Sequence, residues 1–175
     1  MIKTLSLLVI ALSISSATFS ATAQEKEKSA QAPPSARKIP GVTTQDAFPR
    51  GCVDCHTNHP ELSLDARFST LMKEWNTKVE PGLLAKAQAA APKGVTLKGK
   101  HPAVAYALKN IPEGCLTCHS KKSTQAPPFA QMLHKIHLTG GEENLFLTMY
   151  QGECTHCHKL NSSTGQWSLA SSPEP

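Results

Sequence analysis

Hydrophobic residues in this chain gather in short amphipathic stretches, which prolines and glycines separate. The clearest stretch predicts a helix, because five apolar residues recur at the spacing of a single helix face: Phe68, Leu71, Met72, Trp75 and Val79. Asp65 is expected to start this helix, and Pro81 with Gly82 is expected to end it.

Between these prolines and glycines, further short helices are predicted at residues 83–91, at 101–110 and at 129–138. Another is predicted in a segment that begins at Glu142. The helix at 101–110 would open with His101 and Pro102, since proline suits the first helical position. In the last segment, the residues expected to face inward are Leu145, Phe146 and Met149. Together these elements predict a mainly α protein with extensive coil and little or no β-sheet.

All six cysteines lie in three copies of one pentapeptide, Cys-x-x-Cys-His, at residues 52–56, 115–119 and 154–158. This pentapeptide is the signature of c-type haem attachment. Two thiols at this spacing can each add to a vinyl group of one haem, and the adjacent histidine can bind the iron as its proximal ligand. The sequence therefore predicts three covalent haems held by Cys52, Cys55, His56, Cys115, Cys118, His119, Cys154, Cys157 and His158.

Three other chemistries use Cys-x-x-Cys pairs. Zinc sites need four ligands, and three identical pentapeptides do not divide naturally into such sites. A thioredoxin-like redox site needs a βαβ pattern, which does not surround these motifs. A disulfide scaffold stays open for an exported protein, although it leaves the histidine after every second cysteine unexplained.

The amino-terminal residues predict export. A positive start, an apolar stretch from Leu5 to Ile14 and the small residues before Gln24 are typical of a signal peptide at 1–23, cleaved after Ala23. The apolar stretch is too short to span a bilayer comfortably. We therefore expect a periplasmic protein with no stable membrane span after cleavage.

Beyond the signal peptide, residues 24–47 are polar and contain prolines, which predicts a flexible arm. Residues 48–165 would form the trihaem domain, and residues 166–175 a short tail. Aliphatic and aromatic residues are thinly spread, so we expect the porphyrins to supply much of the core. The formal net charge of +5 falls once haem propionates are counted, and we expect no nucleic-acid binding.

Candidates for the second axial ligand of each iron are four further histidines, which outnumber the three positions: His59, His101, His134 and His137. His134 and His137 would project from nearly one helix face. His59 is too close to His56 to reach the other side of the same haem. His156, between the cysteines of the third motif, is predicted to be a surface residue or a propionate contact.

The three motifs, the export signal and the extra histidines resemble a small multihaem (trihaem) c-type cytochrome of bacterial respiratory electron transfer. The segment His134-Lys135-Ile136-His137 ahead of a Cys-x-x-Cys-His motif is similar to segments of larger multihaem cytochromes that reduce external acceptors. The resemblance implies short helices around three covalent haem c groups, bis-histidine ligation and electron carriage. The chain departs from the class III tetrahaem pattern, which has four haems.

With two histidines on every iron, no position would be open to a substrate, so we expect an electron carrier and not an enzyme. Bis-histidine ligation would give lower potentials than His/Met ligation. The expected partners are other redox proteins, such as a quinol-oxidising cytochrome or a terminal reductase, bound through small transient contacts. The alternative is an enzyme, or a reductase subunit, in which one open haem reduces a small oxidised nitrogen or sulfur species.

Overall fold

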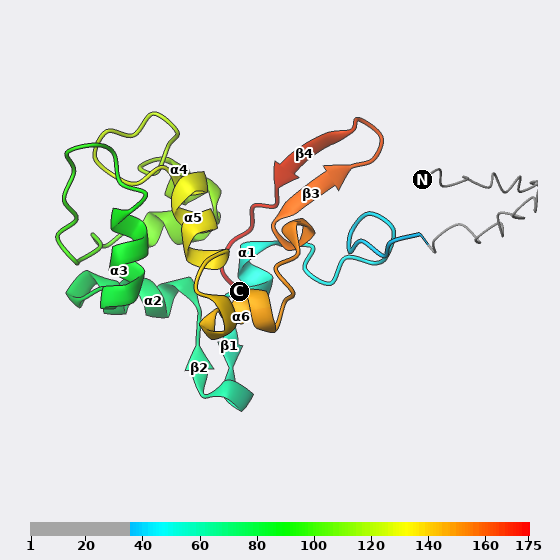
Figure 1. The fold of residues 1–175 in the computed structure, drawn as a ribbon, viewed down its shortest axis with the longest axis horizontal. Coiled ribbons are helices and arrows are strands. Elements are labelled where there is room, and N and C mark those ends of the chain that lie inside the picture. The colour runs from blue at the N-terminus through cyan, green and yellow to red at the C-terminus, as the bar shows by residue number, and fades with distance from the viewer. Residues whose placement is uncertain (1–35) are drawn as a thin grey trace, which may run out of the picture. The chain divides into compact units, whose positions relative to one another are not determined.

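Short helices and long connecting segments dominate the computed structural model, which describes residues 36–175 (Figure 1). The predicted signal peptide, 1–23, and residues 24–35 of the predicted arm lie outside the described residues. The α-helices are α1 (Cys52–Cys55), α2 (Phe68–Thr77), α3 (Pro81–Gln88), α4 (Glu113–Leu116), α5 (Phe129–His137) and α6 (Leu145–Thr148). The 3-10 helices are η1 (Pro60–Leu62), η2 (Ala105–Lys109), η3 (Gly141–Glu143) and η4 (Cys154–His156).

The strands form two small antiparallel sheets. They pair β1 (Asn58–His59) with β2 (Leu64–Asp65), and β3 (His158–Asn161) with β4 (Gln166–Leu169). In the second sheet His158 lies opposite Leu169, and Leu160 lies opposite Trp167. Helical residues outnumber strand residues in the described chain, which agrees with the predicted helical character, and the β-structure is limited to these two hairpins. No helix in residues 36–175 is both long and apolar enough to cross a membrane.

The predicted helix on the Phe68–Val79 face forms as α2, but its boundaries differ from those expected. Asp65 belongs to β2, and its carboxylate accepts hydrogen bonds from Arg67 and from the hydroxyl of Thr70. Pro81 does not end a helix but begins α3, where proline occupies the first helical turn. Glu80 caps α3 by accepting hydrogen bonds from the N–H groups of Gly82 and Leu83, at 2.7 Å each.

The prediction of a helix from residue 101 is wrong. His101 to Val104 are extended or irregular, and only Ala105–Lys109 forms a helix, of the 3-10 type. The reason is tertiary: the His101 N–H donates to the Trp75 carbonyl at 2.8 Å, and the Val79 N–H donates to the Gly99 carbonyl at 2.8 Å. These bonds join residues 99–101 to the end of α2, so these residues do not form a helical turn.

Helix α5 agrees closely with the predicted helix at 129–138. The segment after it divides into η3 and α6, and the prediction that its apolar residues face inward holds only in part. Leu145 is 46% exposed and Met149 is 48% exposed. Phe146 alone is half-buried, with its ring centre 5.5 Å from that of His137.

The apolar core of the described residues is small, consisting of Val53, Ala90, Ala107 and Ile111. Helix α4 approaches η2 so closely that a Cβ on Gly114 would lie 2.5 Å from the Cα and the carbonyl oxygen of Ala107. Ile111 is held by both of its backbone groups, which pair with Ser172 near the carboxyl end. The last residues of the chain are therefore part of the fold around the second motif.

Residues 36–47, the described part of the predicted arm, form a turn beside the third motif. The carbonyl of Ile39 accepts hydrogen bonds from the N–H groups of three residues, Val42, Thr43 and Thr44. Lys159 then forms an ion pair with Asp46 at 2.9 Å.

Candidate functional site

Each Cys-x-x-Cys-His motif lies on a helical turn. The first occupies α1, the second begins in α4, and the third begins in η4. Residues three apart on a helix are neighbours on its surface, so the two thiols of each motif project to one side. A glycine with positive φ, Gly51 at 68° and Gly152 at 61°, precedes the first and third motifs and turns the backbone into them.

The histidines that end the motifs each face a histidine from another part of the chain. The rings form three pairs, with centres 6.1, 6.0 and 6.1 Å apart respectively: the first pair His56–His137, the second pair His119–His101 and the third pair His158–His134. Every motif histidine is thereby matched with a candidate distal histidine. The sequence left four candidates for three positions, and the structure brings three of them to the motifs.

These separations fit an iron between the two rings of each pair. A metal–imidazole bond is about 2 Å long, and the bonding nitrogen lies about 1 Å from the ring centre, so two axial imidazoles on one metal have centres roughly 6 Å apart. Other ring contacts in the described residues have centres 4.2 to 6.4 Å apart, so the separation by itself does not mark a pair. The specific feature of the site is that every motif histidine meets one of the candidate distal histidines at this separation.

Backbone carbonyls orient four of the six paired rings. The Nδ1 atoms of His56 and His119 lie 3.0 and 2.7 Å from the carbonyls of Ala66 and Pro127. A hydrogen bond at Nδ1 fixes the tautomer with Nε2 free to bind metal. The same bond on the distal side joins the Nδ1 atoms of His101 and His137 to the carbonyls of Pro102 and Leu133, at 2.8 and 3.0 Å.

Burial favours the neutral form of three of these rings, those of His56, His101 and His137. It is the largest influence on the pKa of His56, which falls to about 4, and it also lowers the pKa values of His101 and His137. Neutral imidazole is the form that ligates metal, so no protonation opposes ligation near pH 7.

Helix α5 supplies His134 to the third pair and His137 to the first, and two side chains hold the end of this helix. The Asn144 amide donates to the carbonyls of Ile136, His137 and Thr139 at 2.8–2.9 Å. Lys86, from α3, donates to the Thr139 carbonyl at 3.0 Å. These donors satisfy carbonyls that lack partners at a helix end, and they fix α5 relative to the motifs.

The two cysteines of the first motif differ from redox-active thiols. Burial is the main cause that raises the pKa of Cys52 to about 11 and that of Cys55 to about 12, and the nearby Cys157 thiol adds to both shifts. A redox-active Cys-x-x-Cys site instead needs a lowered thiol pKa. All six cysteines lie within the described residues, and none of them is paired in a disulfide.

The arrangement also differs from a zinc site. A structural zinc site gathers four protein ligands, whereas residues 36–175 contain no group of three or more His, Cys, Asp or Glu side chains placed to hold a metal ion. Two histidines on opposite sides suit a metal whose other four positions are filled by a porphyrin. The scarcity of buried apolar side chains fits the same group, because a porphyrin supplies apolar surface that the chain lacks.

His59 lies apart from the pairs. Its Nε2 is 2.8 Å from the Cys55 carbonyl, and its Nδ1 is 3.3 Å from the Glu61 carboxylate. Both ring nitrogens are thus occupied by local partners, one in the first motif and one in the loop that follows it, and among residues 36–175 the His59 ring faces no motif histidine.

The third motif contains the buried polar residues that the sequence did not predict. His156 is 8% exposed, so the predicted surface position is wrong, whereas the predicted contact with a haem propionate stays a prediction. Its ring packs against Phe48 with ring centres 4.5 Å apart. Its Nδ1 and the hydroxyl of Thr155 are buried and have no hydrogen-bond partner among residues 36–175. Phe48, just ahead of the first motif, is the aromatic residue that could have indicated this burial. Nothing in the sequence, however, linked Phe48 to the third motif.

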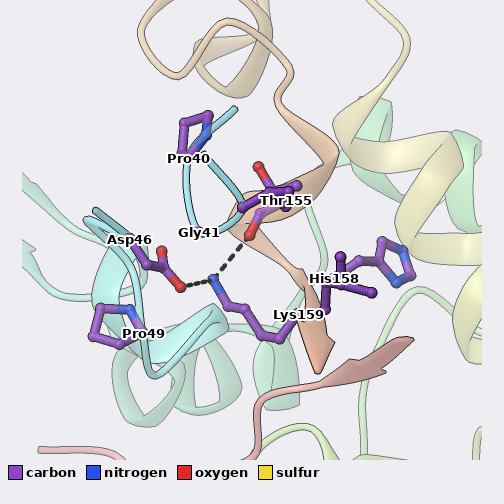
Figure 2. Close-up of a pocket in the computed structure, with 9 residues that line it drawn as sticks. Pro40, Gly41, Asp46, Pro49, Thr155, His158 and Lys159 are labelled. Atoms are coloured by element: carbon purple, nitrogen blue, oxygen red, sulfur yellow. Dashed lines mark hydrogen bonds and ion pairs between the residues drawn. The ribbon is translucent and has the colours of Figure 1, made fainter. Parts of the chain in front are cut away.

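Lys159 anchors this motif to the amino-terminal turn. Figure 2 shows its ammonium group between the carboxylate of Asp46 and the carbonyl of Thr155. The ammonium nitrogen is 2.9 Å from each of these groups, and the residues line a hollow of about 200 Å³. The imidazole of His158 projects the other way, as expected for neighbouring residues of a strand. The ion pair therefore holds the start of β3 without occupying the side on which His158 meets His134.

Comparisons of the chain with protein-family models, with curated proteins and with solved structures returned no match.

Proposed function

We propose that this protein is a periplasmic electron carrier with three covalently attached c-type haems, each bound axially by two histidines. The observation that supports this most strongly is the pairing itself, in which the three motif histidines each meet another histidine at 6.0–6.1 Å. A single such pair arises easily by chance in a chain with eight histidines. Three pairs that together include every motif histidine do not.

The chain's own residues have distinct roles in this proposal. The cysteines form the thioether attachment, the motif histidines are the proximal ligands, and His137, His101 and His134 are the distal ligands to the first, second and third sites. When bound, haem c supplies an iron that alternates between ferric and ferrous states and so takes up and releases one electron. The carbonyls of Ala66 and Pro127 orient the proximal rings.

Carriage is favoured over catalysis because no motif histidine is left without a partner. An open haem enzyme needs a vacant axial position and an acid or base beside it. In the described residues, each candidate position faces an imidazole instead. The partners would then be redox proteins, such as a quinol-oxidising cytochrome or a terminal reductase, and two imidazoles per iron favour low potentials.

Spectroscopy of the purified, haem-loaded protein tests the proposal. Intact mass should exceed that of the mature chain by three haems, and near-infrared magnetic circular dichroism should show only low-spin, bis-histidine ferric iron. Fewer than three covalent haems, or a high-spin site that binds nitrite or cyanide at once, would contradict the proposal for the corresponding motif.

A further inference from the structure

Positive charge is concentrated in one part of the described chain. Residues 71–110 contain seven lysines and two glutamates, while the rest of residues 36–175 contains eight basic and nine acidic side chains. The excess therefore belongs to α2, α3 and the segment that follows them. A charge excess confined to one region steers encounters with partners of opposite charge.

Three of these lysines surround an apolar hollow. The hollow has a volume of about 470 Å³, with Val79, Pro81 and Leu84 among its apolar lining residues. Lys78, Lys98 and Lys100 also line it, and all three are exposed. We call this surface the lysine-rimmed hollow.

The lysines of the hollow are not engaged in ion pairs among residues 36–175, where the pairs that form involve other side chains. The nearest acid in sequence is Glu80, whose carboxylate oxygens accept hydrogen bonds from the N–H groups at the start of α3. An apolar centre with charged residues at its edge is the usual composition of a protein-binding surface.

The hollow is joined directly to the second histidine pair. The Val79 N–H bonds to the Gly99 carbonyl, and two residues later the His101 N–H bonds to the Trp75 carbonyl. The Asn76 amide also donates to the His101 carbonyl at 3.1 Å. One short backbone ladder thus includes both Gly99, which lines the hollow, and the distal histidine of the second pair.

We infer that the lysine-rimmed hollow is the docking site for an acidic surface of a redox-protein partner, which exchanges electrons with the site of the second histidine pair. This inference rests on the proposed function, because docking beside His101 matters only if that pair holds a redox centre. The lysines steer the encounter, and the apolar hollow receives a non-polar side chain at the centre of the contact.

The test measures electron transfer into the oxidised, haem-loaded protein by stopped flow, with reduced flavodoxin, a small acidic flavoprotein, as the donor. The variant Lys78→Glu/Lys98→Glu should lower the second-order rate constant at low ionic strength by about tenfold or more. The wild-type rate should fall steeply with added salt, and the variant rate should not. Lys100 is left unchanged because it adjoins His101.

The matched control is Lys38→Glu/Lys109→Glu, which changes the net charge equally at residues that do not line the hollow. It should reduce the rate much less. Equal losses in both variants, or no loss in either, would overturn the docking site. Binding of the wild type to phosphatidylglycerol vesicles that the hollow variant loses, with an unchanged flavodoxin rate, would also overturn it in favour of a membrane contact.

A second donor, reduced methyl viologen, which is small and cationic, distinguishes failure of the docking site from failure of the proposed carrier function. Full reduction of three haems by methyl viologen, together with no effect of the hollow variant on flavodoxin, would reject the docking site and leave the carrier function intact. Absence of reducible haem would reject the carrier function itself.

Discussion

The first two histidine pairs and the third are held by different means. In the first and second pairs, all four rings have their Nδ1 atoms against backbone carbonyls at 2.7–3.0 Å. No hydrogen bond to a ring nitrogen of His134 or His158 is found among residues 36–175, His134 is exposed, and the two ring planes meet at 44°. Backbone contacts therefore set the ring orientation in two pairs, whereas the third depends on the placement of α5 and β3.

This difference predicts the site at which a histidine ligand should exchange most easily. A ring fixed at Nδ1 returns to the same orientation after it leaves a metal, because its partner carbonyl belongs to the backbone. A ring without that bond can rotate away, and an exposed ring can be replaced by a molecule from solvent. The third site is the one at which the carrier would most readily become open.

The largest expected effect comes from removing a distal ligand. His101→Ala should convert one of the three haems to a high-spin form that binds cyanide, and the near-infrared magnetic circular dichroism intensity should fall by about a third. His59→Ala is the control, because among residues 36–175 the His59 ring faces no motif histidine and bonds instead to the Cys55 carbonyl and the Glu61 carboxylate. Its spectrum should match that of the wild type. An unchanged His101→Ala spectrum would remove His101 from the ligand set.

The next largest effect concerns the close packing of α4, where the second motif begins, against η2. Gly114→Ala should destabilise the haem-loaded protein by about 3 kcal/mol, because the added methyl group meets the Ala107 backbone in a contact that cannot relax. Chemical denaturation followed in the Soret band measures this. Gly82→Ala, where the new Cβ meets only the movable Glu80 carboxylate at 3.1 Å, should change the stability by less than about 1 kcal/mol.

A smaller effect distinguishes the third pair in the unmodified protein. Cyanide should bind first at the third site, at a rate about tenfold higher than at the other two, which corresponds to about 1.4 kcal/mol in the barrier. In His134→Ala, the fast phase should become faster still while the slow phases persist. A fast phase that persists unchanged in this variant would assign the labile site to another pair.

The smallest effect concerns the end of α5. Asn144→Ala should cost about 1 kcal/mol of stability, since three carbonyls lose a donor that water replaces in part. It should also raise the rate of cyanide binding at the first and third sites together, because His137 and His134, the proposed distal ligands of these sites, both lie on this helix. Gln131→Ala, an exposed position on α5, should change neither quantity.

The features that the sequence predicted well are local. The motifs can be recognised directly, and α5 follows from helical spacing between a proline pair and two glycines. The helix expected from His101 failed because hydrogen bonds to Trp75 and between Val79 and Gly99 override local propensity. The burial of His156 depends on Phe48, more than a hundred residues earlier, which no local pattern could link to it.

The choice among the candidate ligands also depended on distant contacts. His59, His101, His134 and His137 all lie near motifs in sequence, and the sequence did not determine which three of them meet a motif histidine or which motif each one meets. What separates them is which ring meets a motif histidine in space, and that depends on how α5 and the Gly99–His101 segment pack. The number of proposed haem sites followed from the three motifs, but the histidines proposed as second ligands did not.

The shared position of His134 and His137 on α5 makes two sites dependent on one helical register. Inserting a single residue between Phe129 and His134 would turn both rings by about 100° around the helix axis, away from His158 and His56 together. An insertion elsewhere, in the exposed turn around Gly165, would leave both untouched. The length of the β3–β4 turn is therefore free of this constraint, whereas the length of α5 from Phe129 to His137 is fixed by two separate requirements at once.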